Sequence, residues 1–165
     1  MAAKVSAEEM LDRAVALEKE GWDYFEQASK RTANELAKRT FQRLAVRHDR
    51  HADHIEEIRS LILSKQTPQL QSAEAPQSMF DEIMRTIDRS AAPTAADIAE
   101  LRKAVVYATK LRDVYAHFAD ISDSEWESPL YAMLNREGEA TKLTLADTLD
   151  YLRSNFELTD LSRED

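Results

Sequence analysis

Cysteine is absent from this 165-residue sequence, and glycine and proline are scarce, with two and four residues. Without cysteine the chain has no disulfide framework, no iron–sulfur cluster and no thiolate metal site, so any metal must be held by His, Asp or Glu. The scarcity of glycine and proline disfavours a sheet with its many turns. Because Ala, Leu, Glu, Lys and Arg are plentiful, long helices are favoured. We expect an all-α fold in one domain covering residues 1–165.

Long apolar runs are also missing, and none approaches the length that a bilayer requires. The first residues, MAAKVSAEE, lack the apolar centre of a signal peptide, so we expect a soluble, cytoplasmic protein. Asp and Glu number 31 against 22 Lys and Arg, which gives a formal charge of −9. This charge disfavours sequence-independent binding to nucleic acid or to an anionic membrane. Small molecules, metal ions or another protein are the expected partners.

Capping residues and apolar periodicity predict four long helices and one short helix. The expected caps are Ser6, Asn34, Ser78 with Asp81, Thr94 with Asp97, and Ser128 before Pro129. The expected helices cover residues 6–32, 35–64, 79–89, 95–121 and 129–155. A polar crossover, residues 65–93, separates the second long helix from the third and contains the short one.

The lengths of the connections predict how these helices pack. The break at residues 32–34 is so short that the first two helices should be antiparallel neighbours. Two helical hairpins joined by a long crossover form a four-helix bundle of the kind that needs one long connection. The short helix would close one end of this bundle or meet a second subunit.

Residues 41–62, FQRLAVRHDRHADHIEEIRSLI, place two histidines within an apolar stripe. The stripe consists of Phe41, Leu44, His48, His51, Ile55, Ile58 and Ile62. A buried imidazole needs a partner for each nitrogen, because an unpaired polar group costs about 1–3 kcal/mol. The two histidines could share a metal, or they could form ordinary hydrogen bonds to neighbouring helices. Periodicity leaves both interpretations open.

Glu18 in the first helix and Glu137 in the last lie on or beside apolar stripes. Taken alone, a glutamate in such a position more often lies at the edge of the stripe and reaches water. Both glutamates and both stripe histidines lie near the middles of their helices, so antiparallel packing would bring them to a similar depth. A divalent cation would compensate two buried carboxylates, which are costly when isolated. We therefore expect Glu18, His48, His51 and Glu137 to form a metal site.

The remaining histidines and the aromatic residues are weaker candidates. His54 lies off the stripe and should be on the surface, and His117, beside Phe118, should be a packing histidine. Four aromatic residues could lie near the metal site as redox-active rings or could be ordinary core: Trp22, Tyr24, Tyr107 and Tyr115.

Two segments carry a resemblance to a known family. EKEGWDYFEQA, beginning at Glu18, and the later FQRLAVRHDRHADHI resemble the first half of the ferritin-like, rubrerythrin-type domain. LYAMLNREGEA, which contains Glu137, falls where the second half of that family repeats the motif. The resemblance extends from about Ser6 to Leu152. It implies a di-iron centre with Glu on the first and third helices and Glu-x-x-His on the second and fourth.

Carried over to this chain, the family pattern is incomplete. Glu18, His51 and Glu137 match its ligands, but His48 stands where the bridging Glu of the second helix belongs. On the third helix the matching position is Tyr107 or Ala108, and neither is acidic. On the fourth helix Ala140 replaces the His. Our hypothesis is a mononuclear site of two His and two Glu. The alternative is a decayed site in which both histidines are hydrogen-bonded to Glu18 and Glu137 without metal.

The resemblance also implies a function. It predicts iron-dependent oxidation, such as peroxide reduction or iron oxidation, although the same ligands suit zinc or manganese. The family's cysteine-containing rubredoxin-like domain is absent, so electrons would come from an external donor. The family commonly pairs, which predicts a homodimer. The alternative is a non-catalytic ferritin-like scaffold or interaction protein without metal.

Overall fold

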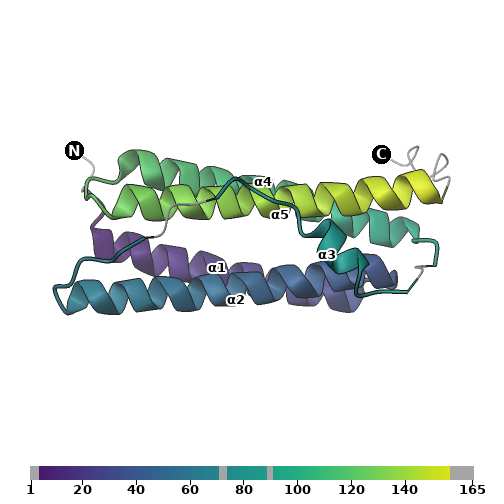
Figure 1. The fold of residues 1–165 in the computed structure, drawn as a ribbon, viewed down its shortest axis with the longest axis horizontal. Coiled ribbons are helices and arrows are strands. Elements are labelled where there is room, and N and C mark those ends of the chain that lie inside the picture. Colours follow the sequence, from purple (N-terminus) through teal and green to yellow (C-terminus); the bar gives the residue numbers. More distant parts are fainter. Residues whose placement is uncertain (1–3, 71–73, 89–90, 157–165) are drawn as a thin grey trace.

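The computed structural model describes residues 4–70, 74–88 and 91–156, and within these ranges the chain is helical and contains no strand. The predicted all-α fold is therefore confirmed for the described residues. The helices are α1 (Ala7–Arg31), α2 (Glu35–Leu63), α3 (Phe80–Met84), α4 (Ala95–Ile121) and α5 (Glu127–Asn155). The four long helices run side by side along the molecule (Figure 1). None of the described helices combines the length and the apolar character needed to cross a bilayer.

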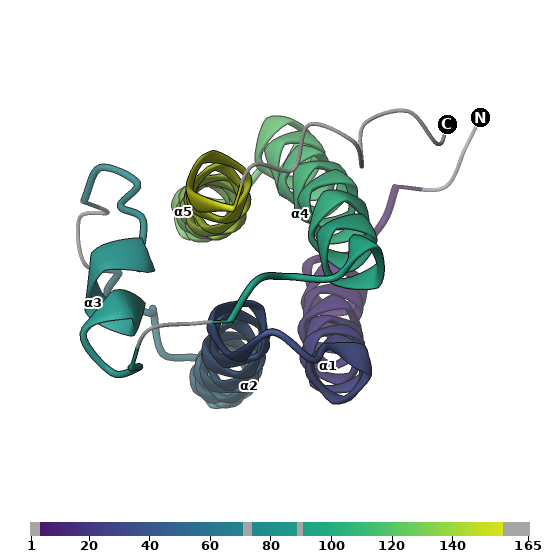
Figure 2. The ribbon, with the colours of Figure 1, turned by 90° about the vertical axis from the view of Figure 1, so that its right-hand side faces the viewer.

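The long helices form two hairpins, as the connection lengths predict. α1 packs mainly on α2, and α4 packs mainly on α5. Seen end-on, α4 lies beside α1 and α5 lies beside α2, so the hairpins face each other (Figure 2). The short helix α3 lies against α2 and α5 on the outside, and its Ile83 is fully buried there.

Several predicted caps are present and one of them also joins the hairpins. Ser6 and Glu9 form a reciprocal capping box at the start of α1, and the Asn34 side chain caps α2. Thr94 and Asp97 form a second capping box at the start of α4. The buried Asp97 carboxylate also accepts a bond from the Ala33 backbone N–H at 2.9 Å. The turn of the first hairpin is thereby tied to the beginning of the second.

Two helix starts differ from the prediction. α5 begins at Glu127, before the expected start at residue 129. The Glu127 carboxylate accepts hydrogen bonds from the backbone N–H and the hydroxyl of Ser124, and these bonds fix the first turn. Pro129 lies in that first turn. Backbone N–H groups there make no hydrogen bond within the helix, so the absence of an N–H in proline removes none. At α3 the predicted capping box is wrong, because the Ser78 hydroxyl accepts from the Phe80 N–H instead. α3 ends at Met84, and residue 89, its expected end, lies outside the described residues.

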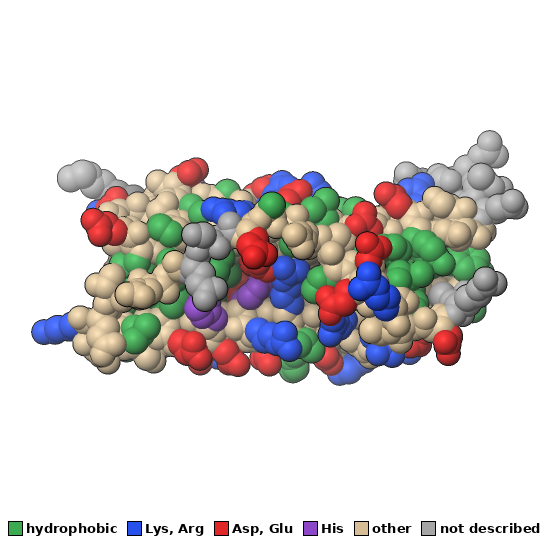
Figure 3. Space-filling view, viewed as in Figure 1, with side chains coloured by type: hydrophobic (Ala, Val, Ile, Leu, Met, Phe, Trp, Pro, Cys, Tyr) green, Lys and Arg blue, Asp and Glu red, His purple; other side chains and the backbone are tan. Residues whose placement is uncertain are grey.

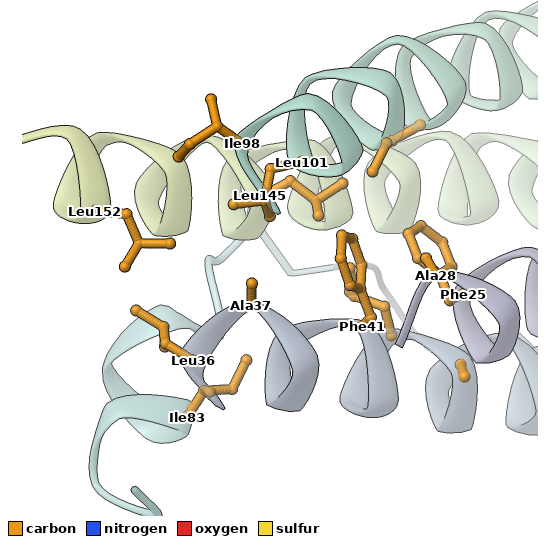
Figure 4. Packing of buried hydrophobic residues seen from close by; sticks show 14 residues of the cluster. Phe25, Ala28, Leu36, Ala37, Phe41, Ile83, Ile98, Leu101, Leu145 and Leu152 are labelled. Carbon is orange, nitrogen blue, oxygen red and sulfur yellow. The ribbon is translucent and has the colours of Figure 1, made fainter. Parts of the chain in front are cut away.

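Two apolar clusters fill the interior, one toward each end of the molecule. The first contains Phe25 and Phe41 packed against Leu101 and Leu145 (Figure 4). The second contains residues such as Leu11, Ile55, Tyr115 and Leu134. Along α1, α2 and α5, the polar candidate residues fall in the sequence between the members of these two clusters. The fold thus places a polar site in the middle of an apolar interior.

One aromatic residue of α1, Trp22, lies outside the core. Trp22 is 43% exposed, whereas its neighbour Gly21 and Phe25, one turn further on, are buried. Successive residues of an α-helix point about 100° apart, so a buried line through Gly21 and Phe25 turns Trp22 toward solvent. Trp22 is therefore not part of the core.

Candidate metal centre

Glu18 lies at the centre of the candidate site, and both of its carboxylate oxygens have partners. Its side chain comes from the middle of α1 and is only 1% exposed. Oε2 lies 2.6 Å from Nδ1 of His48 and 3.2 Å from Nδ1 of His51. Oε1 accepts a hydrogen bond of 2.5 Å from the Tyr115 hydroxyl on α4. The interpretation that Glu18 reaches water at the edge of the stripe is therefore wrong.

Besides its contact with Glu18, His48 packs against two further residues of α1. Its ring stacks on Phe25 with 5.3 Å between the ring centroids. On the Gly21 side the contact is so close that a Cβ at that position would lie 2.7 Å from Nδ1 of His48. Only glycine leaves room for the imidazole there, which explains a glycine in the middle of a long helix. Nε2 of His48 is buried and has no hydrogen-bond partner among the described residues.

His51 lies between Glu18 and Glu137. Its Nε2 is 3.5 Å from Oε2 of Glu137, which comes from the middle of α5. The same Glu137 oxygen accepts bonds from Nε of Arg47 at 2.8 Å and from Nη2 of Arg47. The Glu137 side chain is 34% exposed, so it lies closer to solvent than the other candidate ligands do. All four predicted residues thus form one continuous chain of contacts, with Arg47 at its outer end.

The contacts change the pKa values of three of these groups. Burial alone raises the pKa of Glu18, but hydrogen bonds from His48 and His51 outweigh it and bring the value to about 2. Burial lowers the pKa of His51, and its bonds to Glu137 and Glu18 outweigh it and raise the value to about 9. The hydrogen bond from His51 lowers the pKa of Glu137, and burial raises it. The charge and the hydrogen bond of Arg47 lower it again, and the resulting pKa is about 2. Without metal, a protonated His51 is therefore the internal counter-charge of two carboxylates.

Tyr115 remains a hydrogen-bond donor across the ordinary pH range. Burial, followed by the negative charge of Glu18, raises the pKa of the Tyr115 hydroxyl well above its usual value. The hydroxyl therefore stays protonated and orients one oxygen of the carboxylate. Glu18 accordingly presents only Oε2 to the two imidazoles.

A small cavity of about 10 Å³ lies among these side chains. Its wall is completed by Ala108, Leu111, Tyr115, Leu134, Gly138 and Thr141. A space of roughly this size holds a single water molecule or ion. Ala108, one of the two positions that match the family's third-helix Glu, lies in this wall and offers no ligand. The side facing α4 therefore provides no carboxylate for a second ion.

A larger pocket of about 260 Å³ lies on the outer side of Glu137, between α2, α5 and the crossover. Glu137 lines both spaces, whereas Arg47, Arg136 and Ala140 line only the outer one. Figure 3 shows this face of the molecule, where basic, acidic and histidine side chains lie close together near its middle. Glu137 therefore stands between the buried cavity and the surface.

The group formed by Glu18, His48 and His51 could hold a metal ion. One ligand atom from each residue lies within 4.8 Å of the other two, which is close enough to surround one ion after small adjustments. One carboxylate and two imidazoles form a donor set that suits Fe, Zn and Mn. The unpartnered Nε2 of His48 shows that contacts within the protein do not satisfy every nitrogen of this group. The residues therefore fit a metal, without identifying which one.

Sequence reasoning gave too little weight to Tyr115 and overlooked Arg47. A buried tyrosine needs a partner for its hydroxyl, which was a usable signal for Tyr115. The pairing of Arg47 with Glu137 depends on how α2 and α5 face each other, which periodicity does not specify. His54 is exposed as expected, but His117 is also exposed and is not a packing histidine.

Comparison with protein-family models, curated proteins and solved structures finds no match for this chain. The resemblance to the ferritin-like family therefore rests on the sequence motifs, the helical architecture and the Glu18, His48 and His51 group.

Proposed function

We propose that this chain is a metal-binding protein that holds one ion in a ferritin-like four-helix bundle of the rubrerythrin type. The observation that carries the proposal is the convergence of Glu18, His48 and His51 on a buried, ion-sized cavity. Glu137, the fourth predicted ligand, lines the same cavity but lies outside the group whose ligand atoms converge. The apolar wall at Ala108 supports one ion where the family has two.

The surrounding residues would prepare the site for an ion. Tyr115 orients the Glu18 carboxylate through its bond to Oε1. Phe25 and Gly21 hold the His48 ring. A bound iron ion would supply one-electron redox chemistry, whereas zinc would supply only Lewis acidity. Because the ligands are positioned before an ion arrives, little reorganisation would be needed.

The chemistry that we propose for the site is iron-dependent redox chemistry on a small species, either the reduction of peroxide or the oxidation of iron. The choice of iron over zinc or manganese follows from the family resemblance alone. A cavity of about 10 Å³ admits no large substrate, which is consistent with peroxide or the iron ion itself. The chain contains no cysteine, so peroxide reduction would draw its electrons from a separate donor. By the same resemblance we propose that the protein acts as a homodimer.

A second candidate function is a scaffold that works without metal. The contacts that support it are the two that His51 makes, with Glu18 and with Glu137. Together with the Arg47 bonds to Glu137, they show that the charges can balance internally. In that case the protein would act by binding a partner and not by catalysis.

Metal analysis distinguishes the two functions. The protein is purified after growth with added iron, manganese and zinc, and its metal content is measured for wild type, His51→Ala and His54→Ala. The metal-binding function predicts that His51→Ala loses the ion and several degrees of melting temperature, while His54→Ala, on the exposed side of α2, retains both. A wild-type content below about one ion in ten chains would contradict the metal-binding function, because ligand-matched sites retain their ions.

A further inference from the structure

Glu137 has two competing partners, and they lie on opposite sides of its carboxylate. On the outer side Arg47 donates to Oε2 from Nε, at 2.8 Å, and from Nη2. On the inner side the same oxygen faces Nε2 of His51 at 3.5 Å, a longer contact that still lowers the pKa of Glu137. Arg47 therefore makes the shorter contacts with Glu137.

Arg47 is well placed to remain hydrogen-bonded to the Glu137 carboxylate. Its side chain is 19% exposed, so the ion pair is only partly screened by water. Both of its bonds go to Oε2 of Glu137, and hydrogen bonds between charged groups are stronger than those between neutral ones. The ligand atoms that converge are those of Glu18, His48 and His51, and Glu137 does not belong to that group.

We propose that Arg47 withholds Glu137 from the metal, so that the site binds its ion with three protein ligands and one position left open. This inference rests on the proposed metal-binding function and adds to it a residue that sets affinity. Arg47 is a positioning residue, because it acts on the ion only through Glu137. The open position, on the Glu137 side of the cavity, is where a small substrate would reach the ion.

The consequence is that metal affinity is lower than the four candidate ligands would allow. When Arg47 is removed, Glu137 loses its outer partner and remains in the wall of the cavity, where it is free to act as a ligand. In the wild type, Glu137 must break its hydrogen bonds to the charged Arg47 before it can bind the ion. Arg47→Gln removes this cost, so we expect it to bind metal roughly 10- to 100-fold more tightly.

The test measures Co²⁺ and Zn²⁺ affinities of the full chain by competition with a chelating dye. The variants are Arg47→Gln, Glu137→Gln and the double variant, together with Arg43→Gln as the matched control. Arg43 lies one turn before Arg47 on α2 and pairs with Glu82 instead. Arg43→Gln should leave the affinity within about twofold of wild type, because it lies outside this network.

Arg47→Gln could tighten metal binding in two ways, by releasing Glu137 or by removing a positive charge near the ion. The double variant distinguishes these two effects. We expect Arg47→Gln to tighten binding in the presence of the Glu137 carboxylate and to have little effect in the Glu137→Gln background. The Co²⁺ visible absorption spectrum should also change in Arg47→Gln, since a further protein ligand joins the ion, and should stay the same in Arg43→Gln.

The outcomes are distinguishable. Unchanged or weaker binding in Arg47→Gln, or an equal gain in the Glu137→Gln background, overturns the role of Arg47 and leaves metal binding intact. Wild-type protein that binds neither ion overturns the proposed function and this inference with it. If Arg47→Gln does not fold, Arg47→Lys keeps the charge but loses the paired donors, and a smaller gain in the same direction is expected; no gain there also overturns the inference.

Discussion

The hydroxyl of Tyr115 donates to Oε1 of Glu18 at 2.5 Å, while the other oxygen of that carboxylate faces two imidazoles. This contact joins α4 to α1 across the interior and divides the roles of the two oxygens. One oxygen is used to fix the side chain and the other is available to a ligand.

Removing the Tyr115 hydroxyl should destabilise the protein. In Tyr115→Phe the Oε1 atom of Glu18 stays buried and loses its donor, which should cost about 1–3 kcal/mol in the free energy of unfolding. Urea denaturation measures this cost. Tyr131→Phe is the matched control, because the Tyr131 hydroxyl is buried without a partner among the described residues. That variant should be neutral or slightly stabilised, and equal losses in the two variants would contradict the role of the Tyr115 bond.

Gly21→Ala should be destabilising although alanine is the better helix former. The change gains about 1 kcal/mol of helix propensity. The added Cβ would lie 2.7 Å from Nδ1 of His48, and overpacking of this kind typically costs about 1–3 kcal/mol. It should also displace the imidazole and weaken Co²⁺ binding. In the His48→Ala background the clash is absent, so there Gly21→Ala should stabilise the protein; destabilisation in both backgrounds would argue against the contact.

The stability of the metal-free protein should depend on pH through His51 and Glu18. The pKa of His51 is raised from 6.5 to about 9, so its contribution is complete below pH 6.5 and is lost as the pH rises through 9. The pKa of Glu18 is lowered from 4.5 to about 2, so its contribution is present above pH 4.5 and is lost as the pH falls toward 2. We expect the highest stability from these groups between pH 4.5 and 6.5.

Denaturation in the presence of a chelator, at pH 6 and pH 9, tests the upper limb of this curve. His51→Gln should remove most of the difference between the two pH values, because glutamine does not titrate. His54→Gln, whose side chain is exposed, should preserve the wild-type difference. The assignment fails if His51→Gln retains the full difference.

Asp97→Ala should loosen the connection between the two hairpins. The Asp97 carboxylate accepts from the Ala33 N–H at 2.9 Å and from the Thr94 N–H at 2.8 Å, and it is buried. Leaving these donors unpaired should cost about 1–3 kcal/mol, measured by urea denaturation. Asp147→Ala, on an exposed position of α5, should change the stability by less than about 0.5 kcal/mol. Similar losses in both variants would contradict the role assigned to Asp97.

Much of the fold follows from local signals in the sequence. The caps at Ser6, Asn34 and Thr94 and the spacing of apolar residues predict the long helices closely, because caps and periodicity act over a few residues. The start of α5 was misplaced because the Ser-Pro signal ignores the bonds that Glu127 makes to Ser124.

The site was predictable only in outline. Periodicity placed His48 and His51 on the inner face of α2, but the burial of Glu18 depends on partners from α2 and α4. A lone glutamate beside a stripe carries no signal for those partners. Arg47 was missed for a similar reason, since arginine on a helix is usually solvated and its bond to Glu137 joins residues ninety positions apart.

The packing of His48 also determines how the site can move. Phe25 stacks on its ring, and the ring fills the space that a Cβ at position 21 would need. His51 is 17% exposed and has carboxylates on two sides, so it keeps some freedom to reorient. The two imidazoles are therefore held differently, His48 by packing in the interior and His51 by charged partners nearer the surface.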